Sequence, residues 1–133
     1  MLHRAQYYWG SDCFFFFSHG EVNAIRQACT KLGSISLKGY TLYSTCEPCP
    51  MCMSASVWSE VDAVVFGATF SDAHKYWPQP SSLGAAEVGS RMVREPQVSV
   101  RAEVLREECV AVFDACEAAR VGRKLEMPPH RDD

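Results

Sequence analysis

The stretch TLYSTCEPCPMCMSASVWSEVDAVVFGA, residues 41–68, places two apolar segments on either side of a short segment with helical character. Residues 40–45 follow a glycine and are rich in aromatic and β-branched side chains, so they predict a strand. Residues 49–59 predict a helix with Pro50 in its first turn, where a missing backbone N–H costs nothing. Residues 62–67 predict a second, buried strand. The strand–helix–strand order predicts a parallel pair of strands.

The segments on both sides of this unit predict the rest of an α/β domain. From Glu21 onward apolar side chains recur at helical spacing, and Gly33 supplies a stop. The longest helix is predicted over residues 103–121, and its apolar stripe is predicted to face the core: Leu105, Cys109, Val112, Phe113 and Cys116. The other predicted elements are a buried strand over residues 13–17, a loop with one short helix over residues 71–89, and a last strand over residues 97–100.

Length, charge and cysteine content narrow the class of protein. The 133 residues suit one domain with one core. The formal net charge of −3 argues against a large surface for nucleic acid, and no apolar run is long enough to cross a membrane. The first residues lack the pattern of a secretory leader, so the seven cysteines are expected to be reduced or metal-bound in a cytoplasmic protein.

Three side chains able to bind a metal are expected to meet in this arrangement. His19 lies at the start of the first predicted helix, and Cys49 and Cys52 lie at the start of the second, three residues apart and on the same side. Helices that follow parallel strands begin at one edge of the sheet, where such folds bind ligands. One imidazole and two thiolates suit zinc and leave a fourth position for water. Glu21 is then placed to shuttle protons.

Other interpretations of these residues remain open. Cys46 could complete a closed structural zinc site with four ligands and no place for water. The C-x-x-C-x-x-C run could hold an iron–sulfur cluster, although position 56, where a fourth cysteine is needed, is serine. Glu21 could be only an acidic residue that stabilises a helix N-terminus.

The two motifs together resemble a known family. H-x-E followed by P-C-x-x-C is the signature of zinc deaminases that act on nucleobases, and it reads here His19-Gly-Glu21 and Pro48-Cys49-Pro-Met-Cys52. The segments HGEVNAIRQAC and TLYSTCEPCPMCMSA resemble the cytidine deaminase-like superfamily, most closely guanine deaminases and related nucleoside deaminases. The resemblance covers residues 18–73. Members of this family carry a longer region before the histidine, so reduced N-terminal strands are expected within a single domain over residues 1–133.

The resemblance implies a three-layer α/β/α sandwich with a mixed sheet and a catalytic Zn2+. It implies that His19, Cys49 and Cys52 hold the zinc, that Glu21 transfers protons, and that the backbone N–H of Cys49 steadies the attacked centre. The implied reaction is hydrolytic deamination of a free nucleobase or nucleoside, with guanine converted to xanthine and ammonia as the first expectation. A homodimer is also implied.

The substrate stays open at this point. The alternatives are a cytosine or cytidine deaminase, a tRNA-adenosine deaminase or other editor of RNA or single-stranded DNA, and an inactive zinc-binding partner protein. The acidic net charge disfavours an editor, which needs a positive groove. His74, Tyr76 and Trp77 are expected to close over a flat base, since aromatic side chains stack on such rings. The alternative is a loop packed on its own aromatic side chains.

Overall fold

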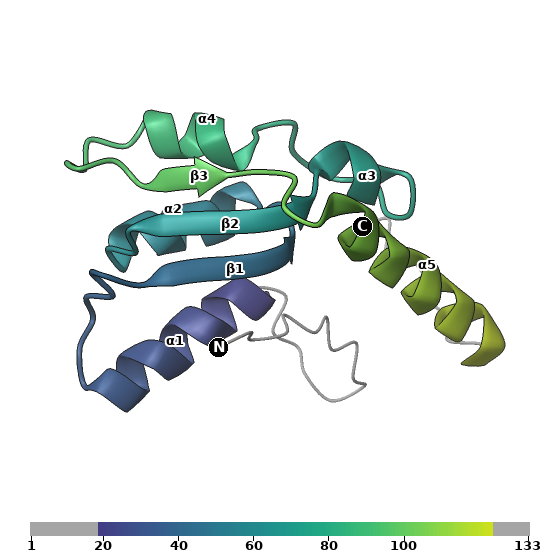
Figure 1. The fold of residues 1–133 in the computed structure, drawn as a ribbon, viewed down its shortest axis with the longest axis horizontal. Helices are drawn as coiled ribbons and strands as arrows, with labels where there is room; N and C mark the ends of the chain where they lie inside the picture. The colour runs from purple at the N-terminus through teal and green to yellow at the C-terminus, as the bar shows by residue number, and fades with distance from the viewer. Residues whose placement is uncertain (1–18, 124–133) are drawn as a thin grey trace, which may run out of the picture.

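A three-stranded sheet with helices packed around it forms the protein (Figure 1). The structure is a computed structural model that describes residues 19–123, so the strand predicted over residues 13–17 lies outside the described residues. In chain order the elements are α1 (Gly20–Leu32), β1 (Thr41–Cys46), α2 (Pro50–Trp58), β2 (Ala63–Ala68), α3 (Phe70–His74), α4 (Ala85–Ser90), β3 (Ser99–Arg101) and α5 (Arg106–Arg123).

The sheet has the order β1-β2-β3, and both neighbouring pairs are parallel. The predicted parallel pair is therefore confirmed, with Leu42 opposite Val64 and Val64 opposite Val100. The three strands within residues 19–123 are all parallel, so the expected mixed sheet is not seen in this part of the chain.

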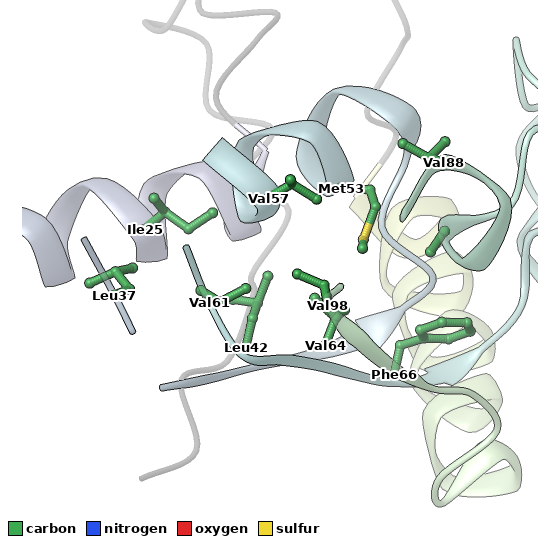
Figure 2. Close-up of a cluster of buried hydrophobic side chains, with 11 residues drawn as sticks. Ile25, Leu37, Leu42, Met53, Val57, Val61, Val64, Phe66, Val88 and Val98 are labelled. Atoms are coloured by element: carbon green, nitrogen blue, oxygen red, sulfur yellow. The ribbon is translucent and has the colours of Figure 1, made fainter. Parts of the chain in front are cut away.

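The main core lies between one face of the sheet and helices α1, α2 and α4. Figure 2 shows Leu42, Val64 and Phe66 on the sheet, below side chains contributed by the three helices. Met53 of α2 and Val64 of β2 are fully buried at the centre of this cluster. α1 ends where Gly33 takes a left-handed conformation with φ 63°, and the predicted glycine stop is thus confirmed. This packing fixes where α1 and α2 begin relative to β1.

Helix α5 contacts β2 from the opposite face, and here one prediction was wrong. Successive residues of a strand point to opposite faces, and Gly67, which follows core residue Phe66, lies against Cys109 of α5. Phe113 is buried, but Cys116 is exposed, as are two more members of the predicted stripe, Leu105 and Val112. The physical reason is that α5 extends away from the sheet beyond its first turns (Figure 1).

The segment between β2 and β3 holds two short helices where the sequence predicted a loop and one. The first, α3, begins at a reciprocal cap in which Thr69 and Asp72 each accept a hydrogen bond from the other's backbone N–H. The Asp72 carboxylate also accepts two hydrogen bonds from Arg106 Nε and Nη2, at 2.8 and 2.9 Å, and so ties α3 to α5. None of the helices within the described residues has the length and apolar character needed to span a membrane.

Candidate metal centre

The three predicted metal ligands lie together at the carboxyl end of β1. His19 is the N-cap of α1, Cys49 is the N-cap of α2, and Cys52 lies in the first turn of α2. One ligand atom from each residue lies within 4.8 Å of the other two. His19 Nδ1 and Cys49 Sγ are 3.5 Å apart, against about 3.6 Å for nitrogen and sulfur ligands of one tetrahedral zinc. The donor set and its spacing fit zinc.

Local folding explains why these side chains meet. β1 and β2 are parallel, so the α2 connection starts where β1 ends, and α1 packs beside α2 with its own first residue at the same edge. Pro50 occupies the first helical position and leaves no backbone N–H unpaired there. Neither His19 nor Cys49 uses its side chain to cap its own helix.

Glu21 places a carboxyl group directly beside a ligand sulfur. The residue lies in the first turn of α1 and is 3% exposed. Its Oε1 accepts a hydrogen bond from the Ser44 hydroxyl at 3.2 Å, and its Oε2 accepts one from the Cys52 thiol at 3.6 Å. Burial raises the pKa of this carboxyl above its ordinary value. A solvated acid at a helix N-terminus would be neither buried nor turned toward a sulfur.

The electrostatics of the group couple the two sulfurs. The interaction with the Cys52 thiol lowers the pKa of the Cys49 thiol, and His19 lowers it further. The same interaction raises the pKa of the Cys52 thiol. The hydrogen bond to Cys49 also raises the pKa of His19. A metal bound to both sulfurs requires both as thiolates, so its binding releases the thiol protons.

Cys46 is not part of the metal group, which consists of His19, Cys49 and Cys52. It is 5% exposed and packs with Ala68, Ala73 and Phe113. Burial raises the pKa of its thiol to about 12, so the thiol stays protonated at neutral pH. Across residues 19–123 the group has three members, which matches an open site and not the closed site with four ligands.

The residues predicted to contact a base lie at the end of α3 and just after it. The rings of Tyr76 and Trp77 each lie 5.4 Å from the ring of Phe113 in α5, and the Tyr76 hydroxyl donates to Asp114 at 2.7 Å. His74 is exposed and its Nδ1 accepts the Gln79 backbone N–H at 3.1 Å. These contacts tie the segment to α5 and do not reach the metal group, so a role in substrate binding stays a prediction.

Sequence reasoning missed two residues that support the site. Ser44 orients the Glu21 carboxyl, and Glu47 accepts hydrogen bonds from the backbones of Phe70 and Ala85. Ser44 could have been noticed, because it lies two residues before the end of β1. That strand leads into residues 47–49, the metal-binding turn. Glu47 gave no local signal, since its partners lie 23 and 38 residues further along the chain.

Comparison with known proteins agrees with this geometry. Residues 11–68 match the cytidine and deoxycytidylate deaminase zinc-binding region. Guanine deaminase of Bacillus subtilis is 48% identical over 56 residues, which cover 42% of this chain and 36% of that protein. The tRNA-specific adenosine deaminase of Bacillus subtilis is 38% identical over 102 residues, which cover 74% of this chain and 57% of that protein.

Solved structures show the same likeness. A protein in complex with 2,6-diaminopurine superimposes with a TM-score of 0.62 at 25% identity, over 77% of this chain and 56% of that one. Guanine deaminase from Nitrosomonas europaea shares the fold, with a TM-score of 0.59 at 24% identity over 75% of this chain and 57% of that one. The chain thus spans less than two thirds of these relatives. Residues 11–68, which contain His19, Cys49 and Cys52, are similar to the cytidine and deoxycytidylate deaminase zinc-binding region, and guanine deaminase and tRNA adenosine deaminase are homologues of this chain.

Proposed function

We propose that this protein is a zinc-dependent aminohydrolase that converts guanine to xanthine and ammonia. The observation that carries the proposal is a buried Glu21 carboxyl beside His19, Cys49 and Cys52, whose ligand atoms lie within 4.8 Å of one another. A carboxyl beside an open metal site with three ligands is the arrangement that hydrolytic deamination needs.

The residues have separate tasks in this reaction. Zinc, when bound, supplies a Lewis acid that makes water a nucleophile near neutral pH. Glu21 takes a proton from water as the water oxygen bonds to the ring carbon that carries the amino group. Glu21 gives this proton to the adjacent ring nitrogen. It then takes the second proton from the newly added hydroxyl, which becomes a carbonyl, and gives it to the amine, whose bond to carbon breaks as ammonia leaves. Its raised pKa suits a group that must both accept and donate a proton.

Two further groups would position the reacting atoms. The Ser44 hydroxyl holds Oε1 of Glu21, which leaves Oε2 on the side of the metal-binding sulfurs. The backbone N–H of Cys49, at the start of α2, would steady the attacked centre. These positions let a single carboxyl act throughout the reaction.

Guanine is the proposed substrate because of two findings about relatives. A guanine deaminase is 48% identical over 56 residues. Solved structural neighbours bind 2,6-diaminopurine and 8-azaguanine. We propose that His74, Tyr76 and Trp77 close over the purine; Tyr76 and Trp77 are half-buried, so part of each ring remains accessible for stacking. We also propose that the protein acts as a homodimer, which sedimentation analysis would test.

Incubating the zinc-loaded protein with guanine, guanosine, adenine and cytosine tests the proposal. We expect ammonia and xanthine from guanine, and release from cytosine without release from guanine would overturn the choice of a purine. Glu21→Gln should keep zinc but lose about 10²–10⁴-fold in kcat, the usual contribution of a general acid–base group. Glu87→Gln is a matched control, because Glu87 is an exposed acid on α4.

A tRNA-adenosine deaminase is the second candidate. The 38% identity to such an enzyme extends over 74% of this chain, which is more than the guanine deaminase match covers. Inosine formation in tRNA without release of ammonia from guanine would favour this candidate. Binding of tRNA to the protein should then weaken steeply as the salt concentration rises. Bound zinc with no turnover of any base or tRNA would favour the inactive partner protein.

A further inference from the structure

Glu47 joins the metal-binding turn to two helices that begin far along the chain. Its backbone N–H donates to the carbonyl of Ala68 at 2.8 Å, which fixes the residue beside the end of β2. Its carboxylate accepts the Phe70 N–H at 3.0 Å on Oε2 and the Ala85 N–H at 2.8 Å on Oε1. One side chain therefore receives the first residue of α3 and the first residue of α4.

These two hydrogen bonds fix both ends of one segment. The N–H groups at a helix start lack partners within the helix, and Gly84, the N-cap of α4, has no side chain to accept one. The two anchored residues are the ends of segment 70–85, which contains the predicted base-binding residues. On its other side Glu47 is separated from Cys49 only by the fully buried Pro48. The carboxylate thus stands between the metal-binding turn and this segment.

We propose that Glu47 is a positioning residue that holds the metal-binding turn and residues 70–85 in one geometry. The inference deepens the proposed function and rests on it for the meaning of the metal group. A carboxylate has two acceptor oxygens, whereas a glutamine of the same size accepts on one side and presents donors on the other. Glu47→Gln therefore breaks one of the two connections without leaving a cavity.

Gly84 allows the same carboxylate to be disturbed from outside. A Cβ built on Gly84 would lie 2.9 Å from Glu47 Oε1, with no other atom outside its immediate neighbours within 4 Å. Oε1 is the end of a flexible side chain, so Gly84→Ala should displace the carboxylate and not the backbone. Two variants at different positions are thus expected to give one phenotype.

Two measurements test the inference. The first is zinc affinity, determined by chelator competition, and the second is the visible spectrum of the cobalt(II)-loaded protein. Loss of a residue that orients ligands from outside the first coordination layer typically weakens metal binding 10–100-fold. We expect about a tenfold loss of zinc affinity and altered cobalt bands in both Glu47→Gln and Gly84→Ala. Thr69→Ala is the control: it removes α3's own cap without touching Glu47, so it should lower the Tm and leave the cobalt spectrum unchanged.

The outcomes separate this inference from the proposed function. The inference is overturned if a folded Glu47→Gln protein has the zinc affinity and cobalt spectrum of the wild type. Glu47 would then only cap the two helices. Should that variant fail to fold, the same result in Gly84→Ala would overturn it. If the two variants lose zinc affinity as expected but the wild-type protein turns over no substrate, the proposed function alone is overturned.

Discussion

Replacing Gly67 by alanine should push α5 away from the sheet and lower the free energy of unfolding. A Cβ at Gly67 would overlap Cys109 Sγ and would lie 2.6 Å from Cys109 Cβ and 3.0 Å from the Val104 carbonyl oxygen. Carbon atoms pack at about 3.5–4.0 Å, so α5 would have to move by about 1 Å. Neither the Cβ nor the carbonyl can swing away, because both belong to or directly join the backbone.

The cost follows from what that movement disturbs. Overpacking a well-filled core costs about 1–3 kcal/mol. Phe113 is one turn after Cys109 and is 4% exposed, and burial of such a side chain contributes about 1.5–3 kcal/mol, part of which would be lost. We expect Gly67→Ala to lower the free energy of unfolding by about 2–4 kcal/mol, measured by urea unfolding followed by circular dichroism.

Two comparisons make this prediction specific. Gly89→Ala is the matched control: Gly89 is also buried, but the nearest atom to its added Cβ is the flexible Met53 Cε at 3.0 Å, so we expect little loss. In the Gly67→Ala background, Cys109→Ala should not restore stability because its Cβ remains, whereas Cys109→Gly should restore part of it. A loss below about 0.5 kcal/mol in Gly67→Ala would refute the packing argument, since surface substitutions stay within that range.

Two further predictions concern charge and metal binding. The Arg106 hydrogen bonds hold the pKa of Asp72 well below its usual range, so this carboxylate stabilises the folded state above its unfolded pKa of about 3.9, and that contribution is lost as pH falls toward the folded pKa. Asp72→Asn should therefore be less stable than the wild type at pH 7, and unfolding curves of the two should converge below about pH 4; a constant difference across this range would contradict the assignment. Cys46→Ala should retain one zinc per chain in elemental analysis, whereas Cys52→Ala should lose it. Loss of metal from Cys46→Ala would instead support the closed site with four ligands.

The sequence predicted the elements that carry strong periodic or turn signals. β1, α2 and β2 were located to within about one or two residues, because strand propensity, Pro50 and the apolar run mark their limits. The metal group was predictable for a related reason. Once α1 and α2 were expected to begin at one edge of the sheet, His19, Cys49 and Cys52 had to lie near one another.

Features that depend on distant partners were not predictable in this way. The apolar stripe of α5 indicates which side of the helix prefers burial, but not how far the sheet extends beneath it, and so Cys116 was wrongly placed in the core. Helix α3 spans five residues, too few to show a helical period; its signal was the Thr69–Asp72 cap. Glu47 acts on residues that no window of sequence around it contains.

The metal group takes one ligand from the N-cap of α1 and two from the N-cap and first turn of α2, and this has a consequence for the chain as a polymer. His19 and Cys49 are 30 positions apart, so an ion bound by both closes a loop of that length, as a disulfide would. For a permanent crosslink of this span, the entropy removed from the unfolded chain corresponds to about 3.6 kcal/mol. Zinc would therefore fasten α1 to the rest of the domain, and chelation should loosen α1 first.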